Sequence, residues 1–154
     1  MTYGSLTLAK QYNSEGKIDQ WMQDFLRADG KNLALADGLL LEERHYFGLC
    51  EIPISLLSDV KSGAPEYLHA ENDIQYFFHV VDRMKESLAD GWDAPPLIVE
   101  YVYGKFQVDD GRHRLETYRQ LGVKRVWAAV WTTGEENRKI VEKILEDNKC
   151  LEYV

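Results

Sequence analysis

The residues best suited to chemistry form a six-residue segment, DDGRHR, at positions 109–114. The pattern around it predicts a strand that ends near Val108 and a helix that begins near Gly111. The first turn of a helix exposes unpaired N–H groups and the positive end of the helix dipole, so each basic side chain there costs about 0.3–1 kcal/mol. A bound anion, with phosphate the best match, would offset that cost. We therefore predict an anion site at this segment, called the DDGRHR turn below.

Each residue of the expected site has a distinct part. Gly111 lets the backbone bend sharply and lets a ligand approach closely. Helical spacing puts Arg112 and Arg114 on opposite flanks of the buried stripe, where two guanidinium groups can hold a phosphate between them. His113 completes the group of basic side chains.

A purely structural interpretation of the same residues stays open. Asp110 can be no more than the N-cap of the helix, which by itself justifies an aspartate at this place. Arg112 and Arg119 can be solvated surface side chains, and His113 can be an ordinary exposed residue. Spacing alone does not decide between this interpretation and anion binding.

The distribution of charge along the chain indicates which kind of anion the predicted site would bind. The chain has 154 residues with 18 basic and 26 acidic side chains, which gives a net charge of −8. Residues 105–125 hold six basic and three acidic side chains, so this segment is locally +3 and the remainder is −11. A negative body argues against autonomous binding to DNA or to anionic lipid, whereas a small positive patch suits a compact anion.

Length and composition predict a single domain over residues 1–154. A hydrophobic content of 45% and a charged content of 29% are ordinary for a globular protein. No stretch approaches the roughly 20 apolar residues of a membrane span, and the N-terminal MTYGSLTLAK lacks the pattern of a signal peptide. Cys50 and Cys150 form no CxxC pair and no disulfide framework. We expect a cytoplasmic protein.

Apolar periodicity and turn residues predict the order helix, strand, helix, two strands, helix, strand, helix. This order predicts an α+β fold, with a small mixed β-sheet flanked by helices, and not a Rossmann fold. Residues 1–45 are expected to form an N-terminal helical extension, with Ile18, Trp21, Met22 and Phe25 at helical spacing. The other expected elements are a strand at 49–54 with Pro53 at an edge, helices at 72–89 and 111–121, two strands around Gly104, a strand at 125–131, and a C-terminal helix at 133–149 with a Thr133–Glu136 capping box.

The segment from about Glu51 to Trp131 resembles the ParB N-terminal domain/sulfiredoxin superfamily. The resemblance rests on EIPISLL, a loop, an amphipathic helix ending ESLADGW, PPLIVEY and, most specifically, DGRHR followed by a short helix and LGVKRV. It implies a ParB/sulfiredoxin-like fold that binds the phosphates of a nucleotide, ATP or CTP, at the DDGRHR turn. Members of the superfamily include sulfiredoxins, which use ATP, ParB proteins, which use CTP, and small kinases.

Departures of this sequence from the family pattern exclude some functions of the superfamily from what we expect. Arg112 stands where sulfiredoxins carry their reactive cysteine, so sulfiredoxin chemistry is not expected. Only 23 residues follow Trp131, so the helix-turn-helix domain of DNA-loading ParB proteins is not expected either. Thr117 replaces a common alanine, and the second phosphate motif of the family has only a weak counterpart at residues 136–138.

The small kinases are the remaining type, because their motif is similar in reading Asp-Gly-x-His-Arg. Asp110 then corresponds to their acidic residue and is the expected catalytic carboxylate. Glu71, from the segment before the long helix, is a second catalytic candidate. Phosphoryl transfer needs charge neutralisation, so Mg²⁺ is expected, with Asp109 and Asp110 as its ligands. The resemblance thus implies a phosphotransferase with an unknown hydroxyl acceptor.

Two other functions stay open. In the first, the protein binds a nucleotide as a regulatory ligand without turnover, and its acidic surface engages a partner protein. In the second, it is a DNA-associated relative of ParB, although the net charge of −8 speaks against tight autonomous DNA binding.

Overall fold

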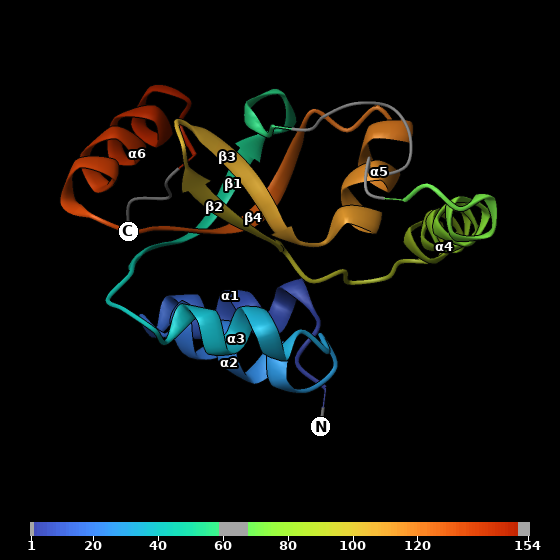
Figure 1. The fold of residues 1–154 in the computed structure, drawn as a ribbon, viewed down its shortest axis with the longest axis horizontal. Coiled ribbons are helices and arrows are strands. Elements are labelled where there is room, and N and C mark those ends of the chain that lie inside the picture. Colours follow the sequence, from blue (N-terminus) through green and yellow to red (C-terminus); the bar gives the residue numbers. More distant parts are fainter. Residues whose placement is uncertain (1, 59–67, 151–154) are drawn as a thin grey trace.

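The computed structural model describes residues 2–58 and 68–150 of the chain (Figure 1). Its elements alternate between helices and strands after an all-helical start. In chain order they are α1 (Leu6–Ser14), α2 (Ile18–Arg27), α3 (Leu33–Leu39), β1 (His45–Pro53), the short 3₁₀ helix η1 (Ile54–Leu56), α4 (Glu71–Ala89), β2 (Leu97–Val102), β3 (Lys105–Asp110), α5 (Arg112–Gln120), β4 (Arg125–Thr132) and α6 (Glu135–Asp147).

The four strands form one mixed sheet in the order β1-β4-β2-β3. Strand β4 runs antiparallel to β1 and parallel to β2, and β2 runs antiparallel to β3. Helices α1, α2 and α3 cover one face, while α5 and α6 lie on the other side (Figure 1). The predicted α+β class, with a small mixed sheet flanked by helices, is confirmed.

The face under α1, α2 and α3 is closed by a compact aromatic core. Trp21, Met22 and Leu26 of α2 are fully buried, and the Trp21 ring stacks on that of Phe25 with centroids 4.9 Å apart. The helical stripe predicted in this region is confirmed. The sequence pattern does not reveal α1 and α3 as separate helices, because α1 buries only Ala9 and α3 has only seven residues.

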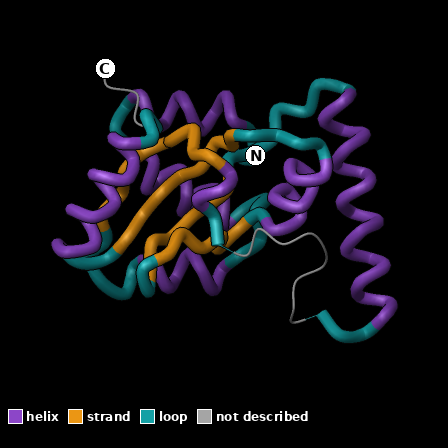
Figure 2. The backbone as a smooth tube through the Cα atoms, turned by 90° about the horizontal axis from the view of Figure 1, so that it is seen from above, coloured by secondary structure: helices purple, strands orange, loops and turns teal. Residues whose placement is uncertain are grey.

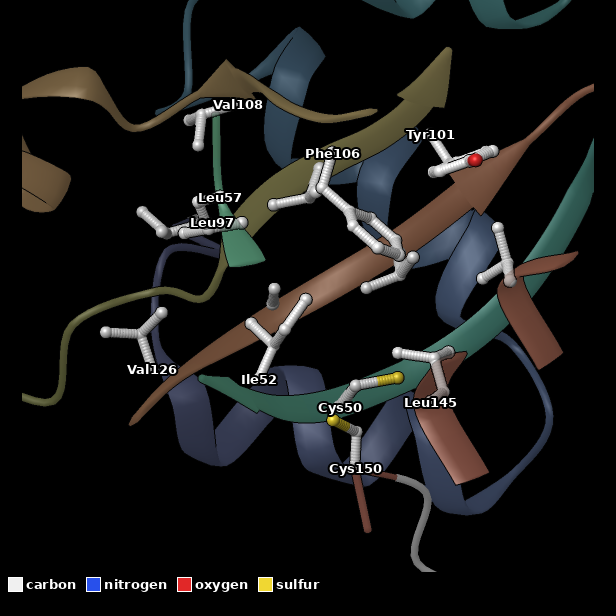
Figure 3. Close-up of a cluster of buried hydrophobic side chains, with 14 of the residues drawn as sticks. Cys50, Ile52, Leu57, Leu97, Tyr101, Phe106, Val108, Val126, Leu145 and Cys150 are labelled. Carbon is white, nitrogen blue, oxygen red and sulfur yellow. The ribbon is translucent and has the colours of Figure 1, made fainter. Parts of the chain in front are cut away.

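The other face carries the second core (Figure 3). Ile52 and Leu97 of the sheet pack in one cluster with Leu115 of α5 and with Val141 and Leu145 of α6. Full burial of such side chains stabilises the fold by about 1.5–3 kcal/mol each. Burial of Leu115 therefore holds the first turns of α5 against the sheet. This contact fixes the position of the DDGRHR turn.

Helix α4 stands outside both layers, at the far side of α5 from the sheet (Figure 2). The helix predicted at 72–89 is confirmed, and it begins one residue earlier, at Glu71. Only Phe77 and Val81 of its apolar stripe are buried. Although α4 has 19 residues, neither it nor any other helix in the described ranges is apolar enough to cross a membrane.

Two predictions about β1 have different outcomes. Pro53 lies in an edge strand, as predicted. The strand begins at His45, earlier than predicted, because its register with β4 shifts between Tyr46 and Leu49, where Gly48 has a φ of 81°. This bulge interrupts the alternation of apolar and polar residues from which a strand is predicted.

The two strands predicted around Gly104 are β2 and β3. Tyr103 and Gly104 have φ values of 53° and 75°, which is the backbone of a tight two-residue hairpin. Helix α6 starts differently from the prediction. Its N-cap is Gly134, without a side-chain cap, because the Thr133 hydroxyl instead accepts a hydrogen bond from Arg44 Nη1 at 2.6 Å. The predicted Thr133–Glu136 capping box is therefore wrong.

Candidate functional site

The DDGRHR turn joins the end of β3 to the start of α5, as predicted. Gly111 is the N-cap of α5, with a φ of 110° and a ψ of 29°, a left-handed conformation that strongly favours glycine. A Cβ at this position would lie 2.6 Å from Leu97 Cδ2 and 2.8 Å from Arg114 Nη2. The space beside Gly111 is thus taken by the ends of two side chains, which would have to move to admit a Cβ.

Helix α5 starts without a side-chain cap. Gly111 has no side chain to offer, and the first turn contains no acidic residue. Asp110 belongs to β3 and does not cap the helix, so the interpretation of Asp110 as an N-cap is wrong. The N–H groups of the first turn therefore lack the acceptor that usually stabilises a helix start.

Arg114 turns inward from the first turn of α5. The residue is only 9% exposed, and its Nη2 donates to the Pro96 carbonyl and to Asp110 Oδ2, both at 3.3 Å. Its Nε has no hydrogen-bond partner among the described residues. These bonds are long for a charged donor, and a buried guanidinium normally satisfies more of its N–H groups. Arg114 thus retains hydrogen-bonding capacity beside the turn.

The side chain of His113 packs against α4. Its ring lies against that of Phe77, with centroids 4.6 Å apart and an angle of 30° between the planes. Partial burial lowers the pKa of His113, and the positive charge of Arg114 lowers it further. At neutral pH the imidazole is therefore mainly neutral, so His113 contributes a hydrogen-bonding group more than a charge.

Asp109 has hydrogen-bond partners of its own, different from those of Asp110. The register of β2 with β3 shifts next to Asp109, and its carboxylate accepts hydrogen bonds from Trp131 Nε1 at 3.1 Å and Gln107 Nε2 at 3.3 Å. Burial raises the pKa of Asp109, while these hydrogen bonds and the charge of Arg112 act against the rise.

Glu100 is the partner that sequence reasoning missed. Burial raises the pKa of Glu100 to about 7, and the charge of Asp109 together with a hydrogen bond to it adds to the rise. Two neighbouring carboxyl groups that are poorly hydrated share a proton more readily than they both ionise. Glu100 faces Gln107 across the β2–β3 hairpin. The pairing of Glu100 with Gln107 follows from a hairpin around Gly104, whereas the bulge that brings Asp109 to Glu100 could not be predicted from the sequence.

Asp110 has different neighbours from Asp109. Its carboxylate contacts Arg114 on one side and accepts a weak bond from Asn32 Nδ2, at 3.4 Å, on the other. The described residues contain no group of three or more His, Cys, Asp or Glu side chains arranged to hold a metal ion. Mg²⁺ commonly uses one or two carboxylates together with phosphate oxygens and water, so Asp109 and Asp110 as its ligands stay a prediction.

Glu71 lies apart from the turn. It is exposed in the first turn of α4, where it accepts a hydrogen bond from Gln75 Nε2 at 3.4 Å. Phe77, which contacts His113, follows six residues later, or about 9 Å further along the helix axis. A catalytic role for Glu71 stays a prediction.

A cavity away from the turn offers a contrast to it. It measures about 460 Å³ and lies between the α1–α2 connection, the start of β1, and α6. Its cations are already satisfied by the protein: Arg44 donates to Thr133 and to the Gly38 carbonyl, and Arg138 pairs with Glu142. At the DDGRHR turn, by contrast, Nε of Arg114 has no hydrogen-bond partner among the described residues, as is also true of Nε and Nη1 of Arg119 further along α5.

Similarity to known proteins is found among solved structures. No protein-family model matches the sequence, and no curated protein matches it. Among solved structures, sulfiredoxin from Arabidopsis thaliana is similar with a TM-score of 0.41 and 16% identity, over 59% of this chain and 92% of that one. The C-terminally truncated chromosome-partitioning protein ParB from Caulobacter crescentus, complexed with CTP-gamma-S, is similar with a TM-score of 0.39 and 18% identity, over 69% of this chain and 56% of that one. Both similarities concern the arrangement of elements and say nothing of ligands or residue roles.

Replacing Gly111 tests the geometry of the turn. We expect Gly111→Ala to lower the free energy of unfolding by about 2–4 kcal/mol, because left-handed strain adds to the contacts with Leu97 and Arg114. Gly122→Ala is the matched control, because Gly122 also has a positive φ, of 72°, but a Cβ added there would have no atom within 4 Å. Its cost should be about 1–2 kcal/mol. Equal losses in urea unfolding would contradict the close approach at Gly111.

The raised pKa of Glu100 predicts a pH dependence of stability. Between the ordinary glutamate pKa and about 7, the folded protein keeps a proton that the unfolded chain releases, so stability falls as the pH rises through this window. Glu100→Gln removes this pH dependence. The free energy of unfolding of the variant, relative to that of wild type, should therefore rise by about 1 kcal/mol between pH 5 and pH 8, because solvent screens part of the effect. Glu86→Gln, on the exposed surface of α4, controls for the loss of one charge. Parallel pH curves for wild type and Glu100→Gln would disprove the shared proton.

Proposed function

We propose that this protein binds the phosphate groups of a nucleotide, ATP or CTP, at the start of α5. One observation carries the proposal: the first turn of α5 has no side-chain cap and no acidic residue, and Arg112, His113 and Arg114 bring hydrogen-bond donors to the same helix end. A positive side chain at that end of a helix opposes the helix dipole by about 0.3–1 kcal/mol. A phosphate there would add negative charge at the positive end of the dipole and accept hydrogen bonds from the first-turn N–H groups.

The buried guanidinium of Arg114 supports the same ligand. Placing a charged group where it is 9% exposed, with long hydrogen bonds and an unused Nε, is costly unless a further acceptor completes its contacts. Arg112 brings a second guanidinium to the turn, and its charge already acts on Asp109.

His113 and α4 add a positioning element. The ring contact with Phe77 fixes the imidazole, and its lowered pKa keeps it neutral near pH 7. A neutral imidazole donates one hydrogen bond to a phosphate oxygen without the cost of a further buried charge.

A finer part of the proposal is Mg²⁺-dependent transfer of the terminal phosphoryl group to a hydroxyl acceptor. The metal would supply charge neutralisation, and the residues that would hold it with the phosphates are Asp110 and Asp109. Asp110 fits better, because Asp109 is bound to Trp131 and its pKa is raised. Asp110 would also orient the acceptor hydroxyl, with Glu71 as a second carboxylate if α4 shifts toward the turn.

Binding without turnover is the second candidate, and the neighbours of Asp110 favour it. Its carboxylate already contacts the guanidinium of Arg114 at 3.3 Å, so it is less available to orient an acceptor hydroxyl. In this case the nucleotide is a regulatory ligand, and the strongly acidic remainder of the chain suits contact with a partner protein. A DNA-associated role is a third and less favoured candidate, since the net charge of −8 opposes it.

Titration calorimetry with ATP, CTP and inorganic tripolyphosphate, each with and without Mg²⁺, tests the binding proposal. Wild type should bind a triphosphate, and Arg112→Gln should weaken binding by about tenfold or more, because a charged hydrogen bond is worth about 1.5–3 kcal/mol. Arg83→Gln, on the exposed side of α4, is the matched control for general charge and should change affinity by less than about twofold.

Two results would overturn the proposal. One is that wild type gives no heat of binding with any of the three probes, although its unfolding transition shows that it is folded. The other is an equal loss of affinity in Arg112→Gln and Arg83→Gln, which would place the anion on the general surface.

The transfer step is tested separately, by release or transfer of labelled terminal phosphate from ATP or CTP in the presence of Mg²⁺. If Asp110 orients the acceptor, Asp110→Asn should lower kcat by about 100-fold or more, with a smaller effect on nucleotide affinity. Asp90→Asn, after the end of α4, is the control. Tight binding by wild type without any turnover would reject the kinase and leave the regulatory module.

A further inference from the structure

The two cysteines lie in one core cluster although 99 residues separate them in the sequence. Cys50 belongs to β1, and Cys150 follows the end of α6; they are 0% and 2% exposed, and both are free thiols. Figure 3 shows the two side chains as neighbours at the edge of the sheet, below Leu145. Sequence spacing had given no sign of this, because neither cysteine belongs to a recognisable motif.

Arg125 holds Cys150 in this place. Its Nη2 donates to the Glu51 carbonyl at 2.7 Å and to the Asn148 carbonyl at 3.0 Å, and it lies 3.7 Å from Cys150 Sγ. One guanidinium nitrogen therefore bridges the residue next to Cys50 in β1 and the chain around Cys150. The bridge keeps the end of α6 against β1, with the two thiols on the buried side.

We propose that Cys50 and Cys150 are an oxidation site, at which a peroxide converts the thiol pair to an intramolecular disulfide that ties the end of α6 to β1. The inference is independent of the nucleotide site, which lies at the other end of the sheet layer, beside α5 (Figure 1). It concerns only the contact between β1 and the segment that follows α6.

The two thiols have different parts in the reaction. Burial raises the pKa of both, and that of Cys50 reaches about 12, whereas Arg125 counteracts the rise at Cys150. Cys150 is therefore the attacking thiolate and Cys50 the resolving thiol. Because both are buried, the attack requires a local opening at the end of α6, which makes the reaction slower than at an exposed thiol.

The reaction balances with one peroxide. The Cys150 thiolate attacks a peroxide oxygen, the O–O bond breaks, and the departing hydroxide takes up a proton to become water, which leaves a sulfenic acid on Cys150. Cys50 sulfur then attacks Cys150 sulfur, the S–O bond breaks, the S–S bond forms, and the hydroxide leaves as water with the proton of Cys50. Two thiols lose two electrons, and the peroxide is reduced to two molecules of water.

The disulfide should be visible in the oxidised full-length protein. After hydrogen peroxide treatment, unfolding and alkylation, mass spectrometry should find a monomer that lacks two hydrogens and takes up no alkylating reagent. Reduction should restore two reactive thiols. Because the bond closes a long loop in the unfolded chain, the Tm of the oxidised protein should rise by at least about 5 °C.

Cys150→Ser is the matched control, because peroxide also oxidises methionine in both proteins. Its Tm should not rise on oxidation, and Cys50 should stay open to alkylation or overoxidation. Three outcomes would overturn the proposal: two alkylatable thiols in oxidised wild type, a disulfide only between two molecules, or an intramolecular disulfide that lowers the Tm. All three are read from wild type, so a poorly folded variant would not obscure them.

Discussion

The close approach of β2, β3 and α5 at Gly111 is the constraint on which the rest of the site depends. A methyl group of Leu97 and the guanidinium of Arg114 occupy the space where any other residue would place its Cβ. Because the backbone turns there in a left-handed conformation, α5 begins directly after β3, with no side chain to cap it. The same turn that lets strand and helix pack closely therefore leaves polar N–H groups and basic side chains together at one helix end.

The two acids of the turn have different partners within the protein. Asp109 accepts a hydrogen bond from Trp131, and its neighbour Glu100 has a raised pKa. The Asp110 carboxylate lies between Asn32, at the start of α3, and Arg114 of α5. Both acids are thus engaged by the protein itself, and the first turn of α5 contains no acidic residue of its own. This arrangement favours a ligand that is negatively charged over one that is a free cation.

Much of the fold follows from local patterns, and the parts that do not follow have physical causes. The apolar stripe of α4 and the two strands around Gly104 were predictable, because helix and hairpin each leave a short-range signal. The β1 bulge at Gly48 and the shift beside Asp109 were not, since one extra residue in a strand has no reliable signal. At the site, residue type marks Gly111 and Arg114 as candidates, and their role in binding stays a prediction. The pairing of Asp109 with Glu100, and the position of Cys150 beside β1, arise only from tertiary contacts.

The most direct test of the central claim is an amide-resolved NMR titration of the full chain with inorganic tripolyphosphate, which has no base or sugar to bind elsewhere. If the start of α5 holds phosphate, the largest saturable shifts should occur at the amides of Arg112, His113 and Arg114. Shifts that are largest at residues 44–48, which line the cavity at the start of β1, would contradict the account, as would none at the turn.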